Sequence, residues 1–529
     1  MTQRHLSASG TRFAIATPHI AATRAGVAAF DIGGNALDAA LAAAVTLAVV
    51  YPHMCGVGGD LFALVQEPDG RTIALNASGA APRGIDVDAV RTLGSTMPEY
   101  GPLSVTVPGA VSGWAALHRL GAAMPFARAF DDAIRHGRDG IEVAPSLARN
   151  LTWRPERLRS DPGLSAVFFR DGRPLAEREP LVQTALAGTL EAIAAGGPQA
   201  VYGGPVGERL VEGLRAAGSS MSLDDLAAHE PELDSPITLL YRDLHVSVVP
   251  PNSQGFVLLE ILGAVERLGI DPDPLGPDAA LLAEVFRAAS ADRDRHNADP
   301  RFARVPVGTL LDDGHLAALA DQVRTAEQMS AAPAPTKLDG DTIALVAADA
   351  EGRAVSLIQS LSDGFGSGVL EPSTGVILHN RGSGFSLDPA SPNVLAGGKR
   401  PAHTLMPVLV HRDGRLAAVS GSMGGGAQPQ INFQNLVRVF DLGMSPEAAL
   451  DAARWLAGGM DVDNPERFVE AEARVSHVVS RALEAAGYRL ELLGERDEGV
   501  GHAHLITIAP DGMLEAATDP RADGGADAR

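Results

Sequence analysis

The sequence contains a single cysteine, Cys55, among its 529 residues, so no disulfide can form within the chain. Aromatic residues make up only 4% of it, too few to suggest a surface on which nucleic-acid bases stack. No run of lysine and arginine occurs, and the formal net charge is −22. Because nucleic-acid binding depends on a basic face, we expect no nucleic-acid partner.

Long apolar runs are also missing. The longest extends from Ala36 to Val50, which is too short to span a bilayer and contains Asp38. The N-terminal residues lack the basic start and apolar core of a secretory signal peptide. These absences predict a cytoplasmic protein with no membrane segment.

The composition that remains is typical of a globular protein, with 45% hydrophobic and 20% charged residues. The length predicts about three to four core-forming units, and no internal repeat is present. Alanine and glycine dominate, which predicts closely packed helices of small residues and many turns.

The segment Gly33 to Asp60 predicts a buried helix with clear boundaries. Asn35 can cap its N-terminus, Asp38 lies in the first turn, and Pro52 ends it. A short strand, FALV, follows. Strand, turn and helix are predicted again for Ser104 to Gly121 and for Leu244 to Gly269, and the region of about 122–290 is mostly amphipathic helix.

A linker is predicted at 325–341, where proline, alanine, serine and glycine concentrate and no apolar periodicity remains. After it, TIALVAAD and AVSLIQSLS predict a β-hairpin, and further hairpins follow. The C-terminal third is therefore sheet-rich, with helices expected around Asn432 to Leu456 and Val475 to Ala486.

Thr342 stands where this linker meets the first strand of the hairpin. If the peptide bond before it were broken, its new α-amine would have a pKa of about 7.7–8.0. A threonine hydroxyl needs an adjacent base to act as a nucleophile, and the freed amine would supply that base. The same hydroxyl can attack the preceding carbonyl, so the chain could cut itself. Local sequence leaves open the alternative that Thr342 simply begins a strand.

A glycine loop, GSMGGGAQ (Gly421 to Gln428), follows a strand and precedes a helix. Its backbone N–H groups could stabilise an oxyanion, although a plain turn or a phosphate-binding nest has the same composition. It lacks the GxxxxGK[ST] pattern of phosphate loops. The stretch CGVGGD comes after a helix and before a strand, the reverse of the dinucleotide-binding order, which argues against a nucleotide-binding enzyme.

Nine motifs occur in the order found in one known family. They are GGNALDAALAAAVTLAVVYPHMCGVGGD, VPGAVSGW, PPNSQG, the Thr342 strand, FGSGV, TGVILHN, GKRP, GSMGGG and TDPR. Over nearly its whole length the sequence thus resembles the γ-glutamyltransferase family. The resemblance implies an α+β fold, the four-layer α/β/β/α sandwich of N-terminal-nucleophile hydrolases. It also implies a proenzyme that is cut between Asp341 and Thr342 into a large subunit (1–341) and a small subunit (342–529), which form one integrated catalytic unit.

The resemblance assigns the catalytic residues. Thr342 falls on the nucleophile of the family, and Gly424 and Gly425 fall on the glycine pair that donates to the oxyanion. Ser360 stands where the family has a second threonine, whose hydroxyl hydrogen-bonds the nucleophile's amine. A serine hydroxyl can make the same bond.

The positions that bind glutamate in the family differ here. The carboxylate-binding arginine falls on Ser78, and the aspartate that holds the glutamyl amine falls on Gly384. A glutamine becomes Arg381, which can hold a carboxylate in bidentate fashion. These changes predict a small acyl group with a carboxylate and no amine, similar to the oxamate-hydrolysing branch of the family. Alternatively, Arg381 makes only a structural ion pair.

Further substrate-binding residues are expected nearby. A family asparagine becomes Ser362, and a pair of serines becomes His403 and Thr404, while Asn380 adjoins Arg381. Whether His403 contacts substrate or only packs in its loop stays open. The segment that forms a lid loop in the family is shorter here.

The leading hypothesis is a self-processing threonine amidohydrolase acting on a small amide such as oxamate. One alternative is a γ-glutamyl hydrolase or transferase acting on glutathione, and another is an uncut, non-catalytic binding homologue. No cofactor is expected, and no metal, because the pair His502 and His504 lacks a partner cysteine or carboxylate motif. The sequence leaves open whether the processed heterodimer forms a homo-oligomer.

Overall fold

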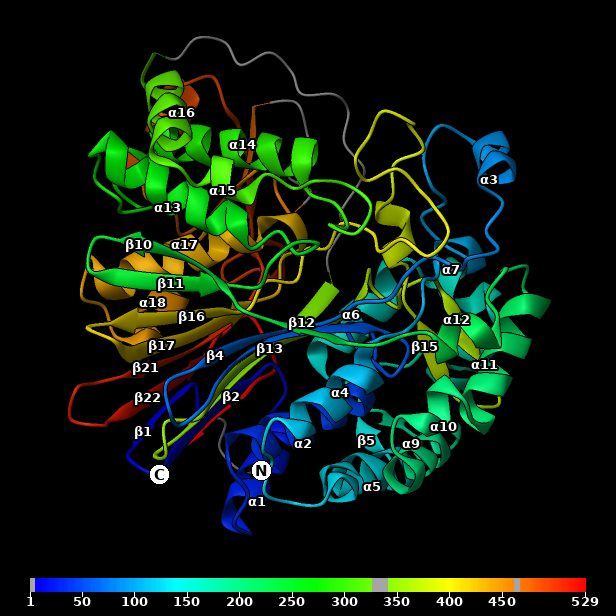
Figure 1. The fold of residues 1–529 in the computed structure, drawn as a ribbon. Coiled ribbons are helices and arrows are strands. Elements are labelled where there is room, and N and C mark those ends of the chain that lie inside the picture. The colour runs from blue at the N-terminus through cyan, green and yellow to red at the C-terminus, as the bar shows by residue number, and fades with distance from the viewer. Residues whose placement is uncertain (1–4, 326–340, 461–466) are drawn as a thin grey trace.

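The computed structural model describes residues 5–325, 341–460 and 467–529. It is a mixed α/β structure in which two seven-stranded sheets lie face to face at the centre. Helices cover the outward face of each sheet, α13 and α14 on one side and α1, α2 and α4 on the other (Figure 1).

The two large sheets take strands from both ends of the chain. The first sheet has the order β1 (Ser7–Gly10), β22 (Leu514–Thr518), β21 (Ala503–Ile508), β17 (Arg415–Ser422), β16 (Val408–Arg412), β11 (Leu244–Val248), β10 (Ile237–Tyr241). The second has the order β23 (Gly525–Ala528), β2 (Phe13–Thr17), β12 (Asp341–Asp349), β13 (Ala354–Ser362), β3 (Asp60–Gln66), β4 (Thr72–Ala77), β9 (Glu232–Asp234).

Short strands form small additional sheets. They are β5 (Ile141–Glu142) with β8 (Pro180–Leu181), β6 (Phe169–Arg170) with β7 (Arg173–Pro174), β14 (Val369–Glu371) with β15 (Val376–Leu378), and β18 (Trp455–Ala457), β19 (Phe468–Glu472) and β20 (Arg489–Leu493).

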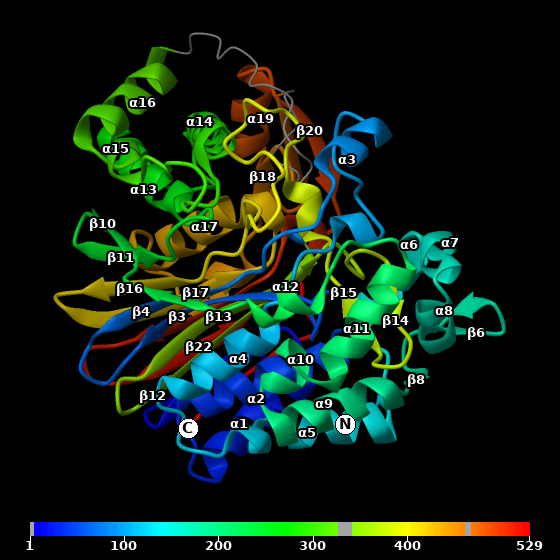
Figure 2. The ribbon, with the colours of Figure 1, turned by 45° about the vertical axis from the view of Figure 1, so that its right-hand side comes forward.

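The helices of the N-terminal part gather against the second sheet and beside it (Figure 2). They are α1 (Ile20–Asp31), α2 (Ala36–Val50), α3 (Val87–Leu93), α4 (Ala110–Arg119), α5 (Asp131–Asp139), α6 (Pro145–Trp153), α7 (Pro155–Ser160), α8 (Pro162–Phe168), α9 (Thr184–Gly196), α10 (Gln199–Tyr202), α11 (Pro205–Ala216) and α12 (Leu223–Ala227).

The remaining helices belong mainly to the layer over the first sheet. They are α13 (Phe256–Leu268), α14 (Ala279–His296), α15 (Val307–Leu310), α16 (Asp313–Thr325), α17 (Gln428–Phe440), α18 (Pro446–Asp451) and α19 (His477–Ala485).

Three apolar cores lie between these layers. One lies between the sheets and contains Ala344, Ile358 and Val419. The outward face of the second sheet packs on α2, whose residues are all buried. The outward face of the first sheet packs on α13, α14 and α17. The central core therefore holds the inner faces of β12 and β13 in a position away from solvent.

The N-terminus of α2 confirms the predicted cap. Asn35 and Asp38 form a capping box, in which each side chain accepts a hydrogen bond from the other's backbone N–H. Asp38 also accepts hydrogen bonds from the backbone N–H groups of Ala123 (2.8 Å) and Met124 (3.0 Å). One buried carboxylate thus fixes both the helix and the loop after α4.

Several predicted boundaries differ from the structure. The hairpin β12–β13 and the strand-to-helix unit β11–α13 are present as predicted. The segment before Pro108 was predicted as a strand, but it is a 3-10 turn followed by irregular backbone that docks on the loop at Ala80 through one hydrogen bond. The region 122–290 contains α5 to α14 and also the strands β5 to β11. Of the predicted linker, residues 326–340 lie outside the described residues.

No helix in the described part of the chain is both long and apolar enough to cross a membrane.

The substitution Asp38→Ala is expected to lower the free energy of unfolding by about 3 kcal/mol, because three backbone N–H groups lose a buried acceptor. Urea unfolding followed by circular dichroism measures the change. The control Asp88→Ala removes a first-turn aspartate whose side chain is 91% exposed, and should change stability by less than about 0.5 kcal/mol. Equal losses in the two variants would contradict this role of Asp38.

Candidate active site

Thr342 is the second residue of β12, and its side chain lies between the two large sheets. It is 1% exposed. Side chains alternate along a strand, so Thr342 faces the same side as Ala344, which belongs to the core between the sheets. The predicted nucleophile therefore has a buried, water-poor environment.

Ser360 connects the Thr342 hydroxyl to the carbonyl that would be attacked in self-cleavage. The two residues are directly paired across β12 and β13, and the Thr342 hydroxyl donates to Ser360 Oγ at 3.0 Å. Ser360 in turn donates to the carbonyl oxygen of Asp341 at 2.7 Å. Its bond to a free amine of Thr342 stays a prediction.

The backbone is irregular at this point. The pairing of β12 with β13 shifts register between Asp341 and Thr342, which leaves Leu361 opposite the bond between them. Ser362, the next residue, has a φ of 81°, a conformation that costs energy for a residue with a side chain. The backbone N–H of Ser362 donates to Ser360 Oγ at 2.8 Å. The bulge therefore accompanies the contact of the Ser360 hydroxyl with the carbonyl of Asp341, whereas the Ser362 hydroxyl contacts Arg381.

Arg381 is the most unusual charged residue of the site. It is 2% exposed and donates only to hydroxyls, Ser362 Oγ at 2.6 Å and Thr404 Oγ1 at 3.4 Å. Its Nε is buried without a hydrogen-bond partner, and no carboxylate of the described residues forms an ion pair with it. Burial lowers the pKa of its guanidinium, and only the more distant charges of Asp363 and Asp60 oppose that effect.

A hydrogen-bonded route leads from Arg381 to the glycine loop. Thr404 contacts the guanidinium through its hydroxyl, while its carbonyl oxygen accepts a bond from Gln254 Nε2 at 2.8 Å. The same nitrogen donates to the carbonyl of Gly425 at 2.9 Å. Arg293 reaches the loop from α14 and donates to Gln254 and to Gly426. Gln254, from the PPNSQG motif, thus fixes two predicted site segments relative to each other.

The glycine loop joins β17 to α17. Gly424 and Gly425 have φ values of 143° and 50°, conformations that favour glycine, and a Cβ at Gly424 would clash with a side chain of α17. Gly421 lies against the inner face of β12, where an added Cβ would be 3.2 Å from that of Ala344. This contact brings the loop close to Thr342. The donor role of the two glycines stays a prediction.

Sequence reasoning missed a buried acid beside the nucleophile. Asp60 begins β3 and pairs directly with Ser360 across the sheet, so it is two strands from Thr342, about 10 Å away. It is 1% exposed and lies 3.2 Å from His403 Nε2 and 3.5 Å from His379 Nδ1. Burial alone would raise the pKa of Asp60, but His379 and His403 hold it below its ordinary value.

The only sequence signal for Asp60 was its place in CGVGGD, at the start of a strand that follows a glycine turn. That motif was interpreted as a poor nucleotide-binding pattern and as part of the first family motif, and neither interpretation assigned a role to Asp60.

His403 accepts a backbone hydrogen bond at Nδ1 from Leu405 (3.3 Å), so its Nε2 carries the proton toward Asp60. Burial lowers the pKa of His403 to about 4, against the opposing effect of Asp60. His403 is therefore neutral at pH 7.

Asn380 is near the site, but both its amide nitrogen and its amide oxygen form hydrogen bonds within the protein. Its nitrogen donates to the Asp363 carboxylate at 2.8 Å and to the carbonyl of Glu99 at 2.9 Å, and its oxygen accepts from the Asp363 N–H at 3.0 Å. It thereby holds the turn that follows Ser362. Asp363, 7% exposed, is a second buried acid that sequence reasoning did not single out.

His502 and His504 are buried with their ring centroids 5.8 Å apart. His504 is hydrogen-bonded to the Thr518 hydroxyl at 3.0 Å, and burial lowers the pKa of His502. Neither ring belongs to a group of side chains close enough to share a metal ion within the part of the chain that the structure describes.

The chain matches known proteins over its whole length. The family model described as Gamma-glutamyltranspeptidase matches residues 22–528. An oxamate amidohydrolase proenzyme of Klebsiella pneumoniae is 38% identical over 99% of each chain. A glutathione hydrolase proenzyme of Escherichia coli is 32% identical over 96% of this chain and 90% of its own. The crystal structure of cephalosporin acylase from Bacillus halodurans has a TM-score of 0.90 at 31% identity, over 100% of this chain and 98% of that one.

These matches define the protein as an enzyme of the hydrolase type. It belongs to the gamma-glutamyltranspeptidase family. The resemblance inferred from the nine motifs is thereby confirmed.

The buried, neutral state of His403 gives a test by pH. The unfolded chain takes up a proton on this residue near pH 6.5, whereas the folded chain does so only near pH 4. Stability is therefore retained above pH 6.5 and lost as the pH falls toward 4. Lowering the pH from 7 to 5 should therefore reduce the free energy of unfolding of the wild type through this residue. In His403→Gln the reduction is expected to be about 2 kcal/mol smaller.

Urea unfolding at the two pH values measures this difference. The exposed His477, replaced by glutamine, is the control and should follow the wild type. A loss in His403→Gln as large as that of the wild type would show that His403 is not held neutral by burial.

Proposed function

We propose that the protein is a self-processing threonine amidohydrolase that cuts its own chain between Asp341 and Thr342 and then hydrolyses a small amide bearing a carboxylate, such as oxamate. The observation that carries the substrate assignment is Arg381, a buried guanidinium without an ion-pair partner among the described residues. The large subunit comprises 1–341 and the small subunit 342–529. We further propose that the two sheets and their helical covers are the four-layer α/β/β/α sandwich of N-terminal-nucleophile hydrolases.

The contacts around Ser360 support a route for self-cleavage. Thr342 Oγ attacks the carbonyl carbon of Asp341 while its proton passes to Ser360 Oγ, the atom 3.0 Å away. Ser360 donates its own proton to the carbonyl oxygen, to which it is already hydrogen-bonded at 2.7 Å. The C–N bond then breaks, the Thr342 nitrogen takes up a proton, and an ester joins Asp341 to Thr342. Water hydrolyses the ester and frees the α-amine.

In the mature enzyme that amine acts as the base. It accepts the hydroxyl proton of Thr342 as Oγ attacks the substrate amide, and returns the proton to the leaving nitrogen. The N–H groups of Gly424 and Gly425 are assigned to the oxyanion, a contribution of several kcal/mol in enzymes of known mechanism. With oxamate, ammonia leaves first, and water then releases oxalate from the ester.

Arg381 is assigned to the substrate carboxylate. Removing an unpaired guanidinium from water is costly, so a bound carboxylate would stabilise the folded site as well as the complex. Ser362 and Thr404 orient the guanidinium through their hydroxyls. Ser362 contacts the guanidinium through its hydroxyl and Ser360 through its backbone N–H, which supports a carboxylate position on the side of the nucleophile. His403 and Asn380 are assigned to shaping the pocket walls.

A γ-glutamyl hydrolase or transferase is the second candidate. It is favoured by Asp363, a buried carboxylate directly after Ser362, which could accept a substrate ammonium group in place of the aspartate missing at Gly384. The relatives include proteins named for each activity.

The two candidates differ in substrate. With purified, self-cleaved enzyme we expect ammonia release from oxamate at a kcat/KM at least about 100-fold above that for γ-glutamyl-p-nitroanilide, because only oxamate brings a carboxylate without an amine. Replacing Arg381 by leucine should lower kcat/KM for oxamate roughly 100-fold or more, since a buried charge pair is lost. Coupled detection of ammonia, and of p-nitroaniline by absorbance, gives both rates.

Arg412→Leu is the matched control, because Arg412 is half-exposed on β16 and pairs with Asp243. Self-cleavage of Arg381→Leu, seen as two bands on a denaturing gel, shows that the variant folds. Turnover of the γ-glutamyl compound without ammonia from oxamate would favour the second candidate. A cleaved Arg381→Leu that retains wild-type kcat/KM on oxamate would refute the role of Arg381.

A further inference from the structure

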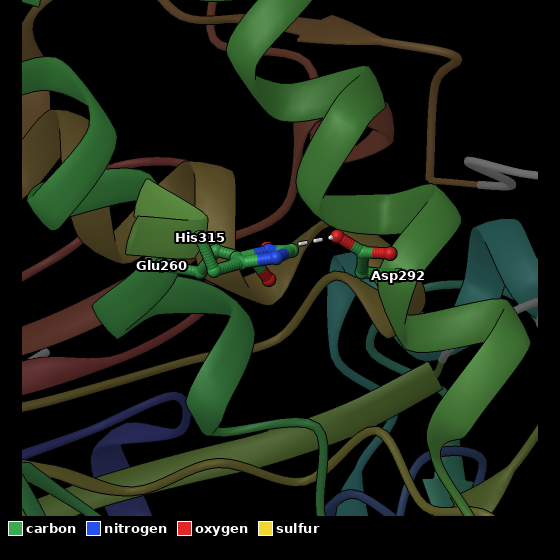
Figure 3. Close-up of side chains that lie close together, drawn as sticks. All are labelled: Glu260, Asp292 and His315. Atoms are coloured by element: carbon green, nitrogen blue, oxygen red, sulfur yellow. Dashed lines mark hydrogen bonds and ion pairs between the residues drawn. The ribbon is translucent and has the colours of Figure 1, made fainter. Parts of the chain in front are cut away.

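A second cluster of charged side chains lies in the helical layer over the first sheet, apart from the Thr342 site. Glu260 comes from α13, Asp292 from α14 and His315 from α16, and their side chains converge between the three helices (Figure 3). One potential ligand atom from each residue lies within 4.8 Å of the others. The sequence gives no motif for this cluster, because the three residues are far apart along the chain.

The imidazole of His315 is shared by the two carboxylates. Its Nε2 lies 2.8 Å from Glu260 Oε1 and 3.1 Å from Asp292 Oδ2. One ring nitrogen carries at most one proton, so it cannot make two full hydrogen bonds to these oxygens. Asp292 uses its other oxygen, Oδ1, to pair with Arg295 at 2.9 Å. Oδ2 therefore faces the cluster.

Glu260 has a buried oxygen atom that no described residue satisfies. It is 0% exposed, and its Oε2 is buried without a hydrogen-bond partner among the described residues. A buried carboxylate oxygen without a partner is costly. This oxygen is a further buried acceptor beside the two carboxylate oxygens that share His315 Nε2.

We propose that Glu260, Asp292 and His315 form a binding site for a divalent transition-metal ion of the zinc class. Two carboxylates and one imidazole are ligands that zinc accepts, with bonds of about 2.0–2.2 Å. At those lengths a tetrahedral ion holds its ligand atoms roughly 3.4 Å apart. The two distances from His315 Nε2, 2.8 and 3.1 Å, would have to widen to reach that value, and the two carboxylate oxygens lie within 4.8 Å of each other.

The cluster is partly open to solvent on one side. The His315 side chain is 26% exposed, so an ion and a water molecule can reach the cluster from the α16 side. Metal binding would displace the protons held by Glu260 and His315, since each must be deprotonated at the coordinating atom. Arg295, which pairs with Asp292 Oδ1, would limit the affinity.

A bound ion would join three helices that support the active site. Residue 293, next to Asp292, is the arginine that hydrogen-bonds the glycine loop, and α13 begins directly after Gln254. The last helix, α16, ends at Thr325, where the predicted linker to the cleavage site begins. The ion would therefore fix the end of the large subunit to the helices behind the oxyanion loop, without touching the substrate.

Isothermal titration of chelator-treated, tag-free protein with zinc chloride tests the proposal. We expect about one equivalent of zinc to bind to the wild type, and Glu260→Gln and His315→Ala each to weaken that binding at least about tenfold. Thermal unfolding should show a zinc-dependent rise in Tm for the wild type and a smaller rise, or none, for the two variants. The readouts are independent of enzymatic activity.

His477→Ala removes an exposed histidine of α19 and is the matched control, which should bind zinc like the wild type. Circular dichroism checks the fold of each variant, and Asp292→Asn replaces any that is misfolded. Absence of zinc binding to the wild type would overturn the proposal. Equal affinity in the ligand variants and the control would do so as well, since the zinc would then bind elsewhere.

Discussion

The pairing of β12 with β13 is the interaction on which the active site depends. It places Thr342 directly opposite Ser360, and the register shift beside it turns the preceding carbonyl toward the Ser360 hydroxyl. Both strands lie in the middle of a sheet that is packed on both faces, so neither can shift without disrupting two cores. The relative positions of Thr342, Ser360 and the Asp341 carbonyl are thus held by two central strands that are packed on both faces.

The buried charged residues of the site differ in whether they have a partner of opposite charge, and this difference limits which ligands can bind. Asp60 is paired with two histidines, so it is satisfied within the protein. Arg381 is surrounded by hydroxyls and has no carboxylate partner among the described residues. Buried charge without a partner lowers stability, and a site that retains it is typically organised for a ligand of opposite sign. This contrast is the physical basis for choosing a carboxylate-bearing substrate.

Local sequence patterns predicted the parts of the structure that depend on local interactions. The capping box of α2, the hairpin at Thr342 and the turn at Gly424 each follow from residues within a few positions of one another. The resemblance to a family then assigned roles to those positions, and the family itself is confirmed.

Contacts between distant segments were not predictable in the same way. Asp60 and Ser360 are neighbours only because β3 pairs with β13, and Gln254 reaches Gly425 only because α13 packs over the sheet. Glu260, Asp292 and His315 likewise meet only when three helices pack together. The spacing of these residues along the sequence does not predict the contacts, because each contact depends on the tertiary fold.

The claim that Thr342 becomes a new N-terminus is tested most directly by an intact-mass measurement on denatured protein. The account predicts two fragments for the wild type, one ending at Asp341 and one beginning at Thr342, and a single uncut chain for Thr342→Ala. Thr342→Ser, which keeps a hydroxyl, should still be cut. An uncut wild-type chain, or a Thr342→Ala chain cut at the same bond, would contradict the account.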